Sequence, residues 1–77
     1  MNNQRRKCLQ NIVDALEAQK QEIESLTEEE QEAFDNMPEG IQYSERGETM
    51  EENISELEDA ASNLDDVINQ ILEIIEK

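Results

Sequence analysis

Residues 50–75 read MEENISELEDAASNLDDVINQILEII, and this stretch decides the fold. Its apolar residues recur at alternating intervals of four and three positions, which is the heptad repeat of a helix packed lengthwise against another helix. A strand would alternate at every second residue instead. The stretch therefore predicts a helix over about residues 45–76, with Ser44 as its N-cap. The apolar stripe consists of Met50, Ile54, Leu57, Ala61, Leu64, Ile68, Ile71 and Ile75.

A weaker heptad stripe precedes it, over about residues 3–37. Asn2 or Asn3 can cap the start of this first helix, and Pro38 ends it. We call the line of residues that faces the partner helix the seam. Two polar members of the first seam, at positions 19 and 30, are expected to fix the register of the pairing. The expected seam is Leu9, Ile12, Leu16, Gln19, Ile23, Leu26, Glu30, Ala33 and Met37.

Proline and glycine lie close together only between these two segments, at Pro38 and Gly40. Residues 38–44 have a suitable length for a turn between antiparallel helices. Each helix has roughly 30 residues, so at 1.5 Å per residue the two are roughly 45–50 Å long and match each other. The sequence therefore predicts an all-α fold with a single domain, residues 1–77, that forms an antiparallel, coiled-coil-like two-helix hairpin.

The length of 77 residues is near the lower limit for a chain that folds alone. A core of this size rarely supplies more than about 3–5 kcal/mol, so small domains usually carry a staple. Cys8 is the only cysteine and histidine is absent, which excludes an internal disulfide and argues against a zinc site. Oligomerisation is the remaining ordinary way to add stability.

The second helix has an apolar face that is wider than one partner helix needs. Its additional apolar residues lie beside the seam, toward the C-terminus. We expect this face to pair two hairpins into a dimeric four-helix bundle, a homodimer, although a thick edge of the hairpin core would produce the same pattern. The candidate self-association residues are Ala60, Val67, Ile71, Leu72 and Ile74.

The charge of the chain is strongly negative and unevenly distributed. Six basic residues oppose 21 acidic ones, for a net charge of −15. Such a charge opposes binding to nucleic acid and to anionic membranes, and it favours basic partners. Residues 21–59 hold 15 acids and one base, Arg46, so the half of the hairpin nearest the turn carries a net −14.

Many of these acids are neighbours at i,i+3 and i,i+4, where like charges destabilise a helix by a few tenths of a kcal/mol per pair. A basic protein surface would relieve that repulsion, and a rigid acidic rod could occupy a groove built for nucleic acid. The simpler interpretation is a solvated face that keeps the protein soluble. The candidate partner-binding residues are Glu22, Glu28, Glu29, Glu32, Asp35, Glu48, Glu51, Glu52, Glu56 and Asp59.

Catalytic and metal chemistry find little support in the sequence. No Asp-rich calcium-binding loop is present, the di-metal motifs need histidine, and two helices offer no desolvated cleft for paired carboxylates. We therefore expect no enzyme activity, cofactor or metal site. No stretch approaches 18 apolar residues, and the basic start lacks a following apolar run, so we expect neither a membrane span nor a secretory signal. A single free cysteine fits the cytoplasm.

The residues around the turn carry a resemblance. The stretches EEEQEAFDNMPE at 28–39 and SERGE at 44–48 are similar to those of small acidic helical-hairpin proteins encoded by bacteriophages and prophages. The likeness covers nearly the whole chain, but its specificity lies in about 20 residues at the turn. The family has no established activity, cofactor or catalytic residue, so what the resemblance implies is context: a small phage protein in the cytoplasm of a bacterial host.

Three functional hypotheses follow. The first is a non-enzymatic protein-binding module, a phage-encoded inhibitor that acts on a basic host protein, such as a DNA-binding or defence enzyme, as a nucleic-acid mimic. The second is a structural or assembly protein that uses the apolar face of its second helix. The third is an oligomeric small-ligand sponge. None of the three involves direct contact with nucleic acid or a membrane.

Overall fold

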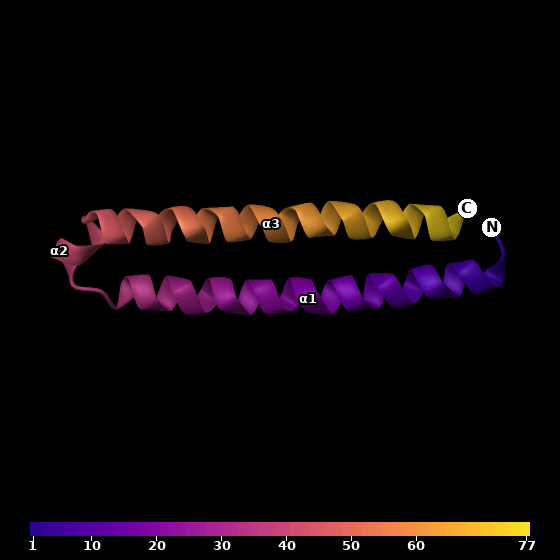
Figure 1. Ribbon diagram of the computed structural model, residues 1–77, viewed down its shortest axis with the longest axis horizontal. Coiled ribbons are helices and arrows are strands. Elements are labelled where there is room, and N and C mark those ends of the chain that lie inside the picture. The colour runs from indigo at the N-terminus through magenta and orange to yellow at the C-terminus, as the bar shows by residue number, and fades with distance from the viewer.

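The computed structural model describes all 77 residues as a long helical hairpin. Helix α1 spans Asn3–Asp35, a short helix α2 spans Glu39–Gln42, and helix α3 spans Glu45–Glu76. The long helices run antiparallel, with α2 at one end and both termini at the other (Figure 1). The rod measures 58 × 14 × 12 Å. The prediction of an all-α hairpin is confirmed.

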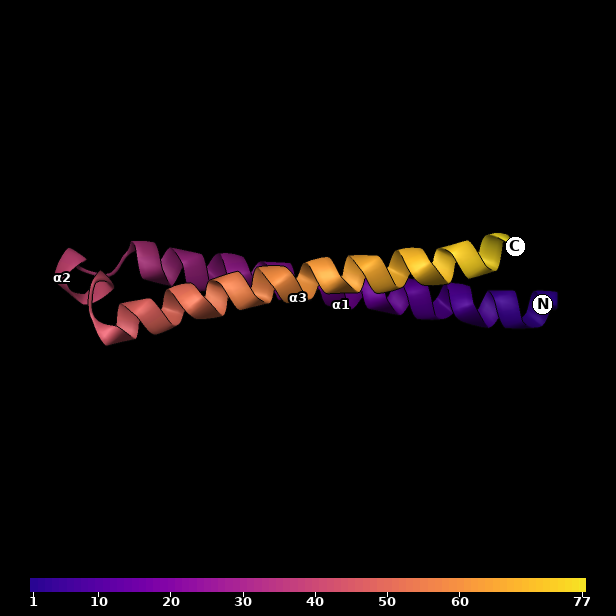
Figure 2. The same ribbon diagram turned by 90° about the horizontal axis from the view of Figure 1, so that it is seen from above.

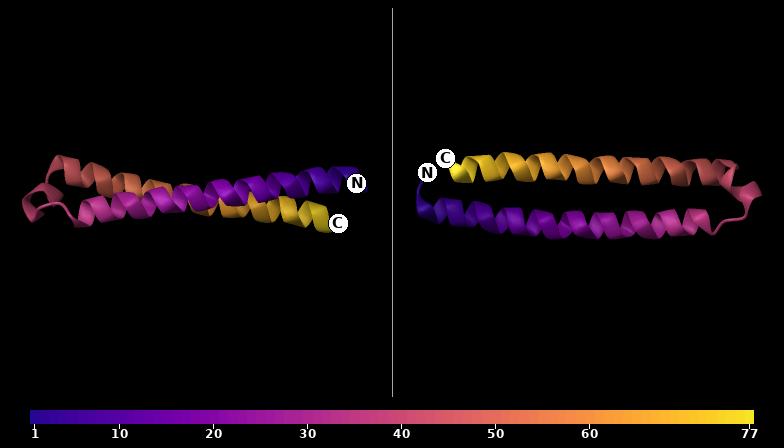
Figure 3. Two further views of the ribbon diagram at one scale, coloured as in Figure 1. Left: turned by 90° about the horizontal axis from the view of Figure 1, so that it is seen from below. Right: turned by 180° about the vertical axis from the view of Figure 1, so that it is seen from behind.

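The two long helices wrap around each other instead of lying strictly parallel. Seen from above, α3 crosses α1 at a shallow angle near the middle of the rod (Figure 2), and the view from below shows the same crossing (Figure 3). A heptad repeat requires this geometry, because a seam with a period of 3.5 residues drifts around a straight helix unless the helices supercoil.

Side chains cap both long helices at their N-termini. The Oδ1 atom of Asn2 accepts a hydrogen bond from the backbone N–H of Arg5 at 2.8 Å, so Asn2 and not Asn3 caps α1. The Oγ atom of Ser44 accepts one from the backbone N–H of Gly47 at 3.5 Å, which confirms Ser44 as the N-cap of α3. Each cap satisfies a donor that has no partner inside its own helix.

The turn is more structured than the sequence predicts. Helix α1 ends at Asp35, two residues before the predicted boundary, and the predicted turn contains α2. The carbonyl of Pro38 accepts from the backbone N–H groups of Ile41 at 2.9 Å and Gln42 at 3.1 Å. The side chain of Gln42 then donates to the carbonyl of Phe34 at 2.9 Å. The Pro38 bonds close α2 itself, and the Gln42 bond attaches α2 to the last turn of α1.

Gly47 lies where the backbone of α2 approaches α3 most closely. It is buried in the first turn of α3. A Cβ atom added to Gly47 would lie 2.1 Å from the carbonyl oxygen of Gln42, and Gly40 has no neighbour within 4 Å of the same position. Glycine lowers helix stability by about 1 kcal/mol relative to alanine, so its presence here reflects this close approach.

The seam of α3 matches the prediction. Ile54, Ala61 and Ile68 are buried, and Gly47 extends the same line toward the turn. The remaining predicted members are half-buried: Met50, Leu57, Leu64, Ile71 and Ile75.

The predicted seam of α1 is wrong at every second position. Four of its residues, Ile12, Gln19, Leu26 and Ala33, are exposed, with Ile12 at 47% and Leu26 at 52%. The residue that follows each of them takes its place, and the buried or half-buried line consists of Arg6, Leu9, Val13, Leu16, Lys20, Ile23, Thr27, Glu30, Phe34 and Met37.

The two versions of the α1 seam differ by a rotation of the helix about its axis. The observed rotation brings the large ring of Phe34 inward in place of the methyl group of Ala33. It also buries Thr27 in place of Leu26, which hydropathy alone would not favour. The hydroxyl of Thr27 donates to the carbonyl of Ile23 at 2.7 Å, so its polar atom keeps a partner when buried.

Candidate functional site

The seam divides the surface of the rod into two flanks with different chemistry. We call the side formed by residues that directly follow a seam residue the acidic flank. Ten of the 21 acids follow a seam residue, and three precede one. The ten acids of the acidic flank are Asp14, Glu17, Glu24, Glu28, Asp35, Glu48, Glu51, Glu58, Asp65 and Glu76.

Both helices contribute carboxylates to a groove along the acidic flank. The floor of this groove is formed by seam residues with short side chains, among them Thr27 and Ala61. Because these side chains are short, they leave a hollow between the two helices. A second hollow continues it toward the turn, over Phe34 and Ile54, and Glu58 lines both. We call the two together the acidic groove; the acids on its rim are Glu24, Glu28, Glu51, Glu58 and Asp65.

Lys20 is the only base in the acidic groove. Its Nζ lies 2.9 Å from Oδ1 of Asp65 on α3 and 3.9 Å from Oε1 of Glu24 on its own helix. The hydrogen bond that Lys20 donates to Asp65 raises the pKa of Lys20 above its usual value; partial desolvation opposes this shift, and the attraction of Asp65, Glu24 and Glu17 adds to it. These are the only two ion pairs in the structure, so the other carboxylates of the groove have no basic partner within the chain.

The raised pKa of Lys20 predicts a loss of stability in alkaline solution. A group whose pKa is higher in the folded chain contributes fully below its unfolded pKa, and that contribution disappears as the pH rises through the folded pKa. We expect the urea midpoint of the wild-type chain to fall toward that of Lys20→Met between pH 10 and 12. Circular dichroism measures both midpoints, with Gln21→Met as the control. A difference that stays constant over this range would contradict a role for the ammonium charge.

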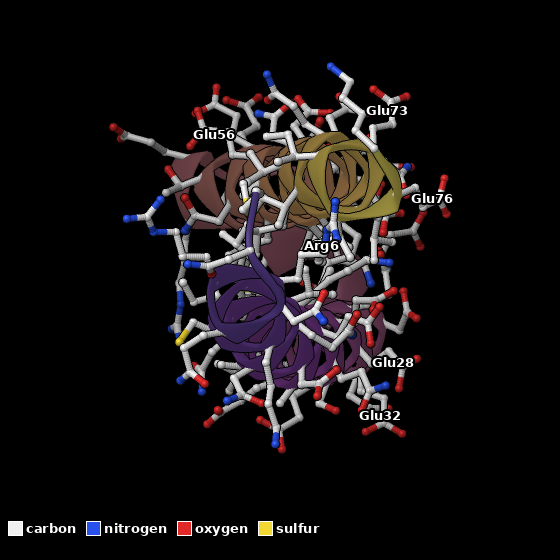
Figure 4. All side chains as sticks on the ribbon, turned by 90° about the vertical axis from the view of Figure 1, so that its right-hand side faces the viewer. Arg6, Glu28, Glu32, Glu56, Glu73 and Glu76 are labelled. Carbon is white, nitrogen blue, oxygen red and sulfur yellow. The ribbon has the colours of Figure 1, made fainter.

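The opposite flank, formed by residues that directly precede a seam residue, combines apolar and polar side chains and contains only three acids. It collects large apolar side chains from both helices, including Ile12 and Leu26 from α1 and Val67 at 43% and Ile74 at 38% exposure from α3. We call it the apolar flank; its core residues are Ile12, Leu26, Ala33, Ala60, Val67 and Ile74. Viewed along the rod from the end with both termini, Glu28 and Glu76 point to one side and Glu56 points to the other (Figure 4).

The structure separates the ten predicted partner-binding acids into three groups, although all ten are exposed. Glu28, Asp35, Glu48 and Glu51 lie on the acidic flank. Glu32, Glu52 and Asp59 lie on the outer backs of the helices, away from the seam, as Figure 4 shows for Glu32. The remaining three, Glu22, Glu29 and Glu56, border the apolar flank.

The five predicted self-association residues also separate. Ala60, Val67 and Ile74 lie on the apolar flank and are exposed. Ile71 is half-buried in the hairpin seam, and Leu72 follows it on the acidic flank. Three of the five therefore share one surface, and the residues that complete it, Ile12 and Leu26, come from α1, where periodicity had placed them in the core.

Sequence reasoning missed four residues of the acidic groove: Lys20, Glu24, Glu58 and Asp65. A signal for three of them was present, since Glu24, Glu58 and Asp65 each follow a correctly predicted seam residue. Lys20 could not be found in this way, because the predicted seam placed Gln19 at that level. The polar seam position expected at Glu30 is half-buried in the structure.

The basic residues near the ends of the rod have few partners. Arg46 is exposed and makes no ion pair. Arg6 points between the two helices at the end with both termini (Figure 4). Its Nη1 donates to Oδ1 of Asn3 at 3.4 Å, and its buried Nε has no partner. The structure brings no three side chains of the metal-binding types together, and neither long helix is apolar enough to cross a bilayer.

Comparisons with protein-family models, with curated proteins and with solved structures find no match to this chain. The resemblance to small acidic phage proteins therefore stays an expectation.

Proposed function

We propose that this protein is a non-enzymatic binding module whose acidic groove engages a basic surface of another protein. The observation that carries the proposal is the placement of the carboxylates: two helices line one groove with five acids on its rim, and Lys20 is the only base there. The specific form of the proposal is a phage-encoded inhibitor, in the cytoplasm of the host, that mimics nucleic acid on a DNA-binding or defence protein.

The energetics of the groove support a partner. Like-charged neighbours such as Glu24 and Glu28, four positions apart, destabilise a helix by a few tenths of a kcal/mol. A mixture of acids and lysines would avoid this loss and keep the same solubility. Basic side chains of a partner would remove the repulsion by charge pairing, and they would speed association through long-range attraction.

The test compares two variants of equal net charge. The groove variant carries Gln at Glu24, Glu28, Glu51 and Glu58, and the back variant carries amides at Glu32, Glu52, Asp59 and Glu73, which face away from the seam. Each immobilised chain is incubated with bacterial lysate at low and high salt, and the bound proteins are identified and titrated. We expect to find a partner protein that binds both the wild-type chain and the back variant. High salt should release this partner from both chains.

The expected loss in the groove variant is at least about fivefold in affinity. An exposed charge pair contributes about 0.2–1 kcal/mol, so four pairs contribute about 1–4 kcal/mol, and 1.4 kcal/mol corresponds to a factor of ten. Equal binding by the groove variant would reject the acidic groove as the site. Duplex DNA should compete with this protein for the partner; failure to compete would reject nucleic-acid mimicry while leaving the groove as the binding site.

The apolar flank favours a second candidate function, in assembly. We propose the dimeric four-helix bundle as the assembled form of the hairpin, since one flank of the rod exposes large apolar side chains from both helices, namely Ile12, Leu26, Val67 and Ile74. In an assembly protein the carboxylates serve only solubility, so the groove variant would retain full function and a charge on the apolar flank would abolish it. The ligand sponge gains no support, because the grooves of the hairpin are open.

A further inference from the structure

The hairpin leaves more surface exposed than a globular chain of its mass. Its accessible surface is 5812 Å². A folded chain of 8.9 kDa is expected to expose about 4,800 Å², so the excess is about 1,000 Å². A standard protein interface buries about 800 Å² on each partner. The unburied surface therefore matches in size what a stable pairing would cover.

Acids are absent from the centre of the apolar flank. Its inner row consists of the residues that precede Arg6, Val13, Lys20, Thr27 and Phe34 on α1 and their equivalents on α3, and none of them is acidic. In a chain with a net charge of −15, a second copy can approach closely only along a side without carboxylates. The inner row contains Arg5, Ile12, Gln19, Leu26, Ala33, Arg46, Asn53, Ala60, Val67 and Ile74.

The apolar flank is symmetric about its middle. The ion pair of Lys20 with Asp65 shows how the two helices are aligned along the rod axis. In this alignment Gln19 of α1 lies beside Val67 of α3. Seven residues to either side of Gln19 lie Ile12 and Leu26; seven residues to either side of Val67 lie Ala60 and Ile74. Ile12 and Ile74 lie at one level of the rod, and Leu26 and Ala60 lie at another. A two-fold axis through the middle would pack the two isoleucines of one copy against the smaller pair, leucine and alanine, of the other copy.

Charge decides the orientation of the two rods. If they lay in the same direction, the two turn halves, each with 15 acids against one base, would lie side by side. In the opposite direction each turn half faces the near-neutral half of the other copy. Two of the three acids that border the flank would then meet bases, with Glu56 near Lys77 of the other copy and Glu29 near its Arg5.

We infer that two copies of this chain pair through their apolar flanks as antiparallel rods, with α1 against α1 and α3 against α3 around a two-fold axis at Val67. This arrangement rests on the assembly proposed above and is independent of the acidic-groove proposal, because it leaves the acidic groove of each copy open on the outer side. The assembled bundle presents two acidic grooves that face in opposite directions.

Sedimentation equilibrium and spin-label distances test the pairing together. We expect twice the 8.9 kDa chain mass for the wild type and for Asn69→Glu, an exposed control on the acidic flank. Val67→Glu adds the same charge on the apolar flank, and we expect at least a 100-fold increase in its dissociation constant. A monomeric wild type at 50 µM, or a Val67→Glu chain that still dimerises, would overturn the inference.

Spin labels at the turn determine the orientation without touching the flank. Tyr43 is 78% exposed at the turn end, and Tyr43→Cys in a Cys8→Ser background provides a single labelling site. Antiparallel rods place the two labels about one rod length, 58 Å, apart. Parallel rods place them within about 20 Å, or two interaxial spacings, and that result would overturn the antiparallel arrangement even if Val67→Glu unfolds.

Discussion

Gly47→Ala should destabilise the hairpin by up to about 2 kcal/mol. The added Cβ would lie 2.1 Å from the carbonyl oxygen of Gln42, and no side chain can move to relieve this contact because the atom belongs to the backbone. Overpacking of this kind costs about 1–3 kcal/mol or more, which outweighs the gain of about 1 kcal/mol from alanine in a helix. Thermal unfolding followed by circular dichroism should show a melting temperature lower by up to about 15 °C.

Gly40→Ala is the matched control for this substitution. Gly40 also lies in a helical segment, but a Cβ there meets no atom within 4 Å. The replacement should stabilise the chain by up to about 1 kcal/mol, because alanine restricts the unfolded chain without strain in the folded one. A change in the free energy of unfolding that has opposite signs for the two substitutions would establish that α2 packs on α3. Equal changes would contradict the close approach at Gly47.

Val13→Asp should unfold the chain at 25 °C. Val13 is 1% exposed and is the most deeply buried side chain of α1. A carboxylate without a partner in that position costs about 3–5 kcal/mol, which is comparable to the whole stability that a core of this size supplies. The far-ultraviolet circular dichroism signal at 222 nm should therefore lose most of its helical amplitude.

Ile12→Asp is the control at the adjacent position. Ile12 is 47% exposed, so the same carboxylate stays in water. The free energy of unfolding, measured at a chain concentration low enough to keep the protein monomeric, should therefore fall by about 1 kcal/mol or less. A larger loss at Ile12 than at Val13 would support the seam expected from periodicity and contradict the observed rotation of α1. Any concentration-dependent loss at Ile12 reports the pairing of two copies.

The sequence predicts the fold well because one stretch admits only one interpretation. Every seam position of α3 from Met50 to Ile75 is apolar, so the helix, its facing side and the antiparallel hairpin follow from spacing alone. Helix α1 has two apolar edges, one through Val13 and one through Ile12 and Leu26. Periodicity cannot decide which edge faces α3, because the choice depends on Phe34, Lys20 and their contacts across the seam.

The candidate site was predicted less completely for the same reason. The acids were identified correctly as exposed and as concentrated toward the turn. Their division between two flanks depends on the rotation of α1, and only the folded hairpin sets that rotation. The placement of Lys20 beside Asp65 links positions 45 residues apart, and no local pattern encodes such a contact.

The compact turn around α2 has a consequence for the order in which the hairpin folds. Seam residues beside the turn, Met37 and Gly47, are ten positions apart in the chain, and Leu9 and Ile75 are 66 apart. Closing the longer loop first would cost about 1.7 kcal/mol more in chain entropy. We therefore expect the two helices to make contact first beside α2 and then to pair progressively toward the termini. Because that first contact brings together the most acidic half of the chain, dissolved cations should accelerate folding by screening the repulsion between carboxylates.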